Sequence, residues 1–370
     1  MMIRTVCIAF ALLASGAAAA QGRMSDYVRG IYEERCLKED VSACRELLAE
    51  DFGVPDATRG RALAVRGQAF MRNGAAADAA ADFANALKIA ETPQDPAMAK
   101  LDAARGVSGL TAEWRSVVQA RLADALLRLT DKANALVAVE KAIKLNGRNG
   151  YAYSVRARLS GSDQQWPAAL ADFDRAIELG MADTVERALT HYRRGLVRGM
   201  LKRPADSQIA DFTAALAADP SLSAALESRA GVYQNLDRHE DALRDYDALT
   251  LREPKYAAGF NAACWTRAAY LKRDFEKARE QCDRALALAA EPNTYDSAGL
   301  VALQQQRWQD AWVLYDKAVK GDAKMASAMY GRGIAAKRLG RVAEAEADLA
   351  AAVRVEAQVG SNYLSYGQNP

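Results

Sequence analysis

Histidine, proline, aromatic residues and net charge are all scarce in this sequence. Its 370 residues include two His and nine Pro, and aromatic residues make up 7% of the chain. So little proline excludes collagen-like and proline-rich disordered chains. The 49 basic and 47 acidic residues nearly cancel, so composition gives no electrostatic case for binding nucleic acid. We therefore expect no nucleic-acid partner.

Apolar residues are abundant but small. They make up 51% of the chain, and about a fifth of all residues are Ala. Ala is the best helix former, whereas strands favour β-branched and aromatic side chains. The composition therefore nearly excludes an all-β fold. After residue 20 no segment approaches eighteen uninterrupted apolar residues, so we do not expect a membrane-embedded protein.

The first twenty residues have the pattern of a secretory signal peptide. Arg4 supplies the positive start, residues 6–13 form a short apolar stretch, and residues 18–20 form an Ala-x-Ala cleavage signal. We therefore expect cleavage after Ala20 and a periplasmic or secreted protein. Cys7 lacks the small-residue context of a lipidated cysteine, which leaves a lipoprotein as the lesser alternative. Cleavage leaves four cysteines, an even number that favours disulfides in an exported protein.

A helical pattern recurs along most of the chain after residue 59. Each repeat has an anchor, usually Ala, then an aromatic or apolar residue four positions later and usually Ala seven positions later. These three positions share one helix face. Twelve positions before each anchor lies a residue that is small in most repeats. This position predicts a second helix in each repeat, and its small side chain lets the two helices pack closely together. The anchors are Ala79, Ala135, Ala169, Gln208, Ala242, Ala278, Ala311 and Ala345.

Repeats of about 34 residues with this pattern resemble the tetratricopeptide repeat (TPR). The match is close for the set Leu226, Ala230, Tyr233, Ala242, Tyr246 and Pro254. The resemblance implies an all-α fold, an α-solenoid that forms a right-handed superhelix of antiparallel helix pairs with about eight TPR units. Segments 261–265, 280–283 and 296–300 are also similar to exported repeat proteins of alphaproteobacteria, a likeness that names no activity.

The repeat boundaries predict the organisation of the chain. We expect a signal peptide at 1–20, an N-terminal helical hairpin at 21–59, the TPR solenoid at 60–359 and a C-terminal tail or cap at 360–370. The spacing of 56 residues between the first two anchors predicts an insertion at 91–115. It could form a loop, but its helical composition favours a short helix on the outside of the array.

The four remaining cysteines form two expected disulfides. Cys264 and Cys282 lie on the two helices of the sixth repeat, which a short turn places side by side, and Asp274 counts as one extra residue in that turn. Cys36 and Cys44 flank a turn and helix start, and would staple the N-terminal hairpin. The alternative is that all four are buried, reduced thiols. Neither pair has Cys-x-x-Cys spacing, so we expect no metal site.

Several apparent catalytic signals have simpler explanations. The Asp-x-Asp motifs at 172–174 and 245–247 imitate metal ligands, but residues two apart on a helix point away from each other. We interpret them as solvated charges beside a buried aromatic. The dinucleotide-like glycines at 331–336 follow no strand, and His191 and His239 have no Ser or Cys to activate. The sequence therefore predicts no enzyme, no catalytic residue, no metal and no cofactor.

The resemblance also implies where ligands would bind. In TPR proteins they usually lie along the concave groove formed by the first helix of each repeat. That register gives as groove candidates Arg121, Asp124, Arg128, Arg158, Tyr192, Arg193, Glu227, Arg267, Tyr270 and Asp296. Arg outnumbers acid in this set, and Arg with Tyr can bind carboxylates or acidic peptides by paired hydrogen bonds and stacking. The alternative is that these Arg side chains only solubilise the protein.

Three functional hypotheses remain. The leading one is a non-catalytic periplasmic scaffold for protein–protein interaction, which binds a protein or peptide segment in the groove. The second is a binder of acidic polysaccharide or cell-wall fragments in the envelope. The third is a structural protein that self-associates as a homo-oligomer through the ends of the array. Val359, Tyr363, Leu364 and Tyr366 could form a short apolar cap, and dimers are expected only if this cap leaves the C-terminal end uncovered.

Overall fold

The computed structural model describes residues 30–36, 38, 40–49, 54–92 and 110–370. All regular elements in these ranges are helical, which confirms the expected all-α fold. The expected signal peptide at 1–20 and most of the expected insertion at 91–115 lie outside the described residues. Within the described ranges, none of the helices has the length and hydropathy that a membrane span requires.

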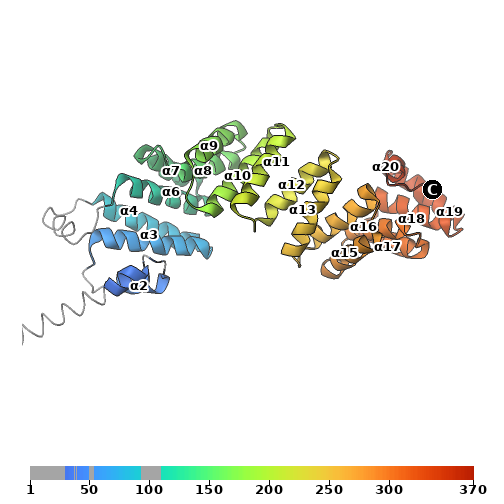
Figure 1. The fold of residues 1–370 in the computed structure, drawn as a ribbon, viewed down its shortest axis with the longest axis horizontal. Coiled ribbons are helices and arrows are strands. Elements are labelled where there is room, and N and C mark those ends of the chain that lie inside the picture. The colour runs from blue at the N-terminus through green and yellow to red at the C-terminus, as the bar shows by residue number, and fades with distance from the viewer. Residues whose placement is uncertain (1–29, 37, 39, 50–53, 93–109) are drawn as a thin grey trace, which may run out of the picture. The chain divides into compact units, whose positions relative to one another are not determined.

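Eight helix pairs follow one another through the described residues, as the repeats predict (Figure 1). The pairs are α3 (Asp56–Arg72) with α4 (Ala76–Glu91), α6 (Ala112–Arg128) with α7 (Lys132–Leu145), α8 (Gly150–Ser162) with α9 (Trp166–Leu179), α10 (Thr184–Met200) with α11 (Ala205–Ala218), α12 (Ser223–Asn235) with α13 (His239–Arg252), α14 (Ala257–Trp265) with α15 (Phe275–Leu288), α16 (Pro292–Gln304) with α17 (Trp308–Gly321), and α18 (Ala326–Arg338) with α19 (Val342–Val355). A helical segment at 30–36 and α2 (Val41–Leu48) precede them, and α20 (Val359–Ser365) follows.

The chain divides into two compact units, of which the first ends at Glu186 and the second begins at Arg187, within α10. The second helix of a pair contacts the first helix of the next, as α4 contacts α6 in unit 1 and α15 contacts α16 in unit 2. First helices also contact each other, as α3 contacts α6, α6 contacts α8 and α16 contacts α18. This stacking of consecutive pairs is that of an α-solenoid. We call the surface formed by α3, α6 and α8 the first-helix face of unit 1.

The two helices of a pair meet where a small residue lies against a large one, as the repeat pattern predicts. A Cβ atom built on Gly67 would lie 2.8 Å from the Phe83 ring, and one built on Gly299 would lie 2.8 Å from the Tyr315 ring. Phe83 and Tyr315 are themselves buried. Because protein interiors are close-packed, this contact sets how closely the two helices approach.

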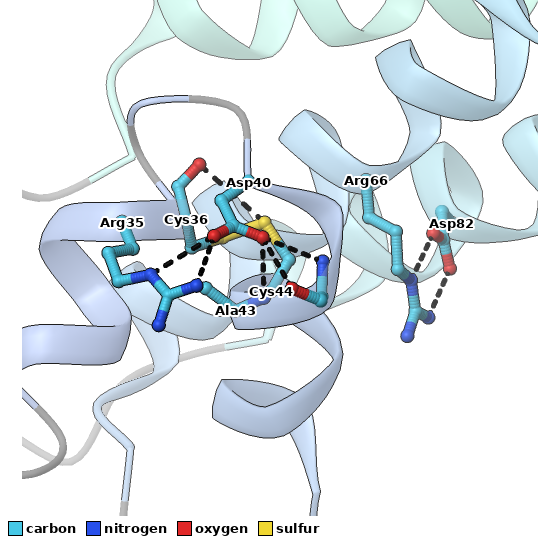
Figure 2. The surroundings of a disulfide bond; sticks show 8 residues. Arg35, Cys36, Asp40, Ala43, Cys44, Arg66 and Asp82 are labelled. Carbon is cyan, nitrogen blue, oxygen red and sulfur yellow. Dashed lines mark hydrogen bonds and ion pairs between the residues drawn. A yellow bond between two sulfur atoms is a disulfide. The ribbon is translucent and has the colours of Figure 1, made fainter.

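The N-terminal hairpin contains the first expected cysteine pair (Figure 2). The Sγ atoms of Cys36 and Cys44 lie 2.06 Å apart, at bonding distance. Asp40 caps α2 by accepting hydrogen bonds from N–H groups of its first turn, and it forms an ion pair with Arg35 at 2.6 Å. Figure 2 shows the Asp40 carboxylate between Arg35 and the start of α2, beside the disulfide. The turn between the two helical segments is therefore held by one covalent bond and one helix cap.

The second cysteine pair joins α14 to α15. The Sγ atoms of Cys264 and Cys282 lie 2.03 Å apart, and both residues are buried. The first helix of this pair continues as a π-helix, η1 (Thr266–Leu271), which takes up extra length because a π-turn holds more residues than an α-turn. The sequence placed the extra residue at Asp274. In the structure Lys272 and Asp274 both adopt left-handed backbone angles in the turn that follows η1.

An Arg–Asp ion pair links the two helices in five of the eight described pairs. The Arg lies on the first helix and the Asp three residues beyond the anchor of the second. The pairs are Arg66–Asp82, Arg156–Asp172, Arg194–Asp211, Arg229–Asp245 and Arg332–Asp348. Figure 2 shows the first of them, with two parallel N–H···O bonds. Our interpretation of Asp172 and Asp245 as solvated charges was therefore wrong, because both carboxylates are buried and paired with an Arg that precedes them by sixteen residues.

Candidate docking surface

Four of the ten groove candidates lie together on the first-helix face of unit 1. Arg121, Asp124 and Arg128 lie on α6, and Arg158 lies on α8. Spacings of three and four residues place the α6 side chains on one side of the helix. The register inferred from the repeats thus brings these residues together in the structure.

Asp124 is the buried centre of this group. Its side chain is 1% exposed, forms ion pairs with Arg158 and with Arg128, the latter at 3.6 Å, and accepts a 3.0 Å hydrogen bond from the Tyr151 hydroxyl. Burial opposes ionisation of the carboxyl, but the charges of Arg158 and Arg128 outweigh it and hold the pKa of Asp124 below its ordinary value. Burial raises the pKa of Tyr151, and the nearby Asp124 carboxylate adds to that rise, so the hydroxyl stays neutral and donates.

Arg121 lies beside this centre and joins two further groups. Its guanidinium carbon lies 4.1 Å from the centre of the Tyr151 ring, a cation–π contact. Its Nη1 atom forms an ion pair with Glu186 at 3.2 Å. Arg121, Arg128 and Arg158 are thus all engaged with carboxylates of the same unit. The locally basic groove expected from the sequence is largely neutralised here.

Two hollows adjoin on the first-helix face of unit 1. One, of about 220 Å³, lies between α3 and α6 and is lined by Arg61, Ala64, Val65, Gln68, Phe83, Trp114, Val117, Val118 and Arg121. The other, of about 300 Å³, is lined by Val117 and Arg121, by residues 146 and 148–151 at the start of α8, and by residues 180–183 and 186. Val117 and Arg121 line both, so the hollows form one continuous track across α6.

Val117 is the apolar residue at the junction of the two hollows. It is 46% exposed, which is unusual for Val, a residue that is most often buried. Trp114 precedes it by one turn of α6 and lines the first hollow. Trp, Tyr and Arg are the side chains most enriched at the energetic centres of protein interfaces. The track therefore combines an exposed apolar centre with Trp114, Tyr151 and Arg121 around it.

A separate hollow of about 390 Å³ lies on the second-helix side of unit 1, between α4 and α7. Its lining combines Leu87, Leu122, Leu126 and the exposed Val137 with Ala, Lys, Glu, Gln and Asn, and it contains no Trp, Tyr or Arg. Ala, Lys and Glu are depleted at interfaces. This hollow is larger, but the residues of the first-helix face fit a binding surface better.

Three of the other candidates lie near the start of unit 2. The Tyr192 ring lies against Phe212, with ring centres 5.8 Å apart. Arg193 is partly buried on the same helix. Glu227 is exposed on α12 and accepts a 2.7 Å hydrogen bond from the Tyr256 hydroxyl.

The last three candidates lie in the sixth and seventh pairs. Tyr270 is partly exposed and stacks on His239, with ring centres 4.2 Å apart. Arg267 is only 2% exposed, and its two terminal nitrogens lie 2.9 and 2.6 Å from the carboxylate oxygens of Asp247. Asp296 is 8% exposed. Arg267 and Asp296 therefore lie inside the protein and not on a groove surface. For Arg267 the reason is that η1 changes the helical register of the sixth repeat.

Sequence reasoning missed Val117, Trp114, Tyr151 and Glu186 as parts of this surface. Neither Trp114 nor Val117 occupies one of the recurring positions of the repeat pattern, so neither has a signal of its own. Tyr151 could have been found, because it begins the first helix of the third repeat, where a side chain can reach the preceding first helix. In the part of the chain that the structure describes, there is no group of three or more His, Cys, Asp or Glu residues that could hold a metal.

No family model and no curated protein matches the sequence. Similar solved structures include MamA, at 18% identity over 51% of this chain and 99% of that chain, with a TM-score of 0.42. YrrB, described as a TPR protein with an unusual peptide-binding site, matches at 19% identity over 56% of this chain and 97% of that chain, with a TM-score of 0.41. A TPR protein from Parabacteroides merdae matches at 15% identity over 76% of this chain and 97% of that chain, with a TM-score of 0.41.

All three TM-scores are below 0.5, so the fold assignment rests on the helix pairs themselves. Seven of the eight described pairs, all except α6 with α7, have the close small-to-large contact, the Arg–Asp link or a disulfide between their two helices. The chain is an α-solenoid of TPR-like helix pairs.

Proposed function

We propose that this protein is a non-catalytic scaffold that binds an extended segment of a partner protein along the first-helix face of unit 1. The observation that supports this most directly is the pair of adjoining hollows centred on the exposed Val117. An extended chain places side chains every two residues on one face, so one segment can fill both hollows. Solenoids usually bind through such extended faces because they enclose no central pocket.

The partner segment should carry apolar side chains at its centre. Arg121, Arg128 and Arg158 already pair with Asp124 or Glu186, so an acidic ligand would have to compete with these carboxylates. Val117 and Trp114 offer contacts that have no such competitor. Binding should therefore depend more on apolar burial than on charge, which makes an acidic polysaccharide the less favoured ligand.

We also propose that the protein works in the periplasm or another oxidising compartment. Two cysteine pairs at bonding distance support this, because disulfides persist outside the reducing cytosol. The signal-peptide pattern at residues 1–20 supports the same location.

The binding proposal can be tested with peptides selected from a random display library against the purified protein. A selected peptide should bind Val117→Asp at least about tenfold more weakly than the unaltered protein, since the change puts a charge at the junction of the hollows. Val137→Asp is the matched control, because Val137 is similarly exposed on α7 and lines the second-helix hollow. Equal loss in both variants, or loss in Val137→Asp alone, would refute binding at the first-helix face.

Salt dependence separates the peptide and polysaccharide hypotheses. Raising NaCl from about 0.05 to about 0.5 M should change the peptide Kd by less than about threefold, because exposed charges are screened while apolar contacts are not. Purified acidic sacculus fragments should show no saturable binding. Tight fragment binding that falls steeply with salt would favour the polysaccharide hypothesis instead.

A further inference from the structure

The C-terminal segment, residues 359–369, lies on the first helices of the last three pairs. α20 contacts α18. The Tyr366 ring, just after α20, lies 5.4 Å from the Trp265 ring of α14 and 6.5 Å from the Tyr270 ring of η1, measured between ring centres. This segment was expected to cap the end of the array. It also reaches back two repeats along the first helices of unit 2.

Tyr363 packs into the space that Gly331 leaves on the surface of α18. It is 2% exposed, and its hydroxyl donates to the Ser327 carbonyl at 2.9 Å and lies 3.0 Å from the Tyr315 hydroxyl. Gly331 makes this possible, since a Cβ atom there would lie 2.5 Å from the Tyr363 hydroxyl and would collide with the Tyr315 ring. The glycine that matched a dinucleotide pattern by letter thus has a packing role.

Gln304 of α16 recognises the part of the segment that follows α20. Its Nε2 atom donates to the Tyr366 carbonyl at 2.7 Å and to the Ala268 carbonyl of η1 at 3.0 Å. Its Oε1 atom accepts a 3.0 Å bond from the Gln368 side chain. Leu364, by contrast, is 60% exposed. The contacts are therefore specific for two tyrosines three positions apart and for the backbone after them.

A buried acid lies beneath the docked segment. Asp296 of α16 accepts a 3.0 Å bond from the Ser327 hydroxyl through Oδ2, while its buried Oδ1 has no hydrogen-bond partner. The titratable groups around it are Tyr315 of α17, Tyr363 of α20 and Tyr366, and within the described residues no cation forms an ion pair with it. Burial raises the pKa of Asp296 to about 7. Docking therefore leaves one polar group unsatisfied, which favours release of the segment over permanent attachment.

We propose that the first helices of the last three pairs form a second binding surface, which fits a helical turn with tyrosines three positions apart, and that residues 359–369 are its exchangeable internal occupant. This surface lies wholly in unit 2 and does not depend on the function proposed for unit 1. Release of the segment uncovers Trp265, Gln304 and the part of the Tyr270 ring that Tyr366 covers, so that a partner segment with the same chemistry can bind them.

The test uses a fluorescent peptide with the sequence of residues 356–370 and the full chain as receptor. The unaltered protein should bind it weakly, because its own segment fills the surface. Tyr366→Ala should bind it about tenfold more tightly, since the internal segment loses its ring contacts while the peptide keeps them. Leu364→Ala is the matched control and should bind as the unaltered protein does. A peptide with both tyrosines changed to Ala should not bind.

Hydrogen exchange shows in each variant whether the C-terminal segment is docked. The Gly367 and Gln368 amides donate to the Leu364 and Tyr363 carbonyls, so their protection reports docking in each variant. Faster exchange in Tyr366→Ala without tighter peptide binding would overturn the proposal, as would unchanged exchange in that variant. Gln368→Ala provides a milder second variant, expected to change both readouts in the same direction by a smaller factor.

The same amides test the part played by Asp296. In the docked state the Asp296 carboxyl keeps its proton up to about pH 7, whereas in the released state it loses that proton near its ordinary pKa. Docking is therefore strongest below the ordinary carboxyl pKa. It weakens as the pH rises from there to about 7 and then stays constant. Opening of the segment, corrected for intrinsic exchange, should therefore increase between about pH 4 and about pH 7 and change little above that. Asp296→Asn should remove this increase. An identical pH dependence in both proteins would show that Asp296 does not control release.

Discussion

At the scale of single residues, the fold depends on small side chains that lie against large ones. Gly299 leaves room for a Tyr315 ring that is itself fully buried and held by contacts with Tyr363. The ring therefore has little freedom to move away from an added methyl group. The Ala-rich composition has a structural reason, because each pair needs a small residue at this position.

Gly299→Ala should destabilise the protein by about 1–2 kcal/mol, because overpacking of the Tyr315 ring outweighs the better helix propensity of Ala. Gly231→Ala is the control, since it lies within α12 with no atom near the added Cβ. That change should stabilise by about 0.5–1 kcal/mol. Urea unfolding followed by circular dichroism measures both. Equal shifts in the same direction would show that the close contact does not constrain position 299.

At the scale of helix pairs, the Arg–Asp links and the Cys264–Cys282 disulfide hold first helices to second helices. Arg229 places two nitrogens at 2.8 and 2.7 Å from the Asp245 carboxylate, which is largely buried. Breaking one side of such a pair leaves an uncompensated charge away from water, which costs more than an exposed pair contributes.

Asp245→Asn should lower the free energy of unfolding by about 2 kcal/mol, because the Arg229 guanidinium loses its charged partner. Glu178→Gln removes the carboxylate from the exposed Arg175–Glu178 pair and should change stability by less than about 0.5 kcal/mol. Denaturant midpoints of the two variants give the comparison. A change at Glu178 as large as that at Asp245 would contradict a role for burial.

Loss of the Cys264–Cys282 bond, by the double change to Ala, should destabilise unit 2 by about 3 kcal/mol, since the bond closes a loop with a sequence separation of 18. The measurement is unfolding with and without reductant. Reductant should destabilise the unaltered protein, and should lower the stability of the double variant less because only the Cys36–Cys44 bond remains. Labelling with a maleimide before reduction should find no free thiol at these four cysteines. Four reactive thiols in the native exported protein would contradict both bonds and the proposed compartment.

The limits of prediction also differ between residues and helix pairs. The Gly67–Phe83 and Gly299–Tyr315 contacts could be predicted because they repeat with the period of the array. The burial of Asp172 could not be predicted from its own helix, since its partner Arg156 lies on the preceding one. The recurrence of Arg and Asp sixteen residues apart in several repeats would have revealed it. Arg267 was misplaced because the π-helix occurs in one repeat only.

At the scale of the whole molecule, the number and order of helix pairs were predictable and the use of their surfaces was not. The repeat gives every first helix the same candidate positions, but the two units present them differently. In unit 1 the first-helix face carries two adjoining hollows. In unit 2 the chain's own Tyr363 and Tyr366 lie on the first helices. In unit 2 the difference comes from residues 359–369, which lie outside the repeat, and periodicity cannot report them.

If the first-helix face of unit 1 binds a partner segment, Val117 lies at the centre of the contact. Its methyl groups can be followed by NMR while a library-selected peptide is added to the protein. We expect the Val117 resonances to shift in proportion to the bound fraction and those of Val137, on the second-helix side, to stay in place. Saturable shifts at Val137 with none at Val117 would refute binding at the first-helix face.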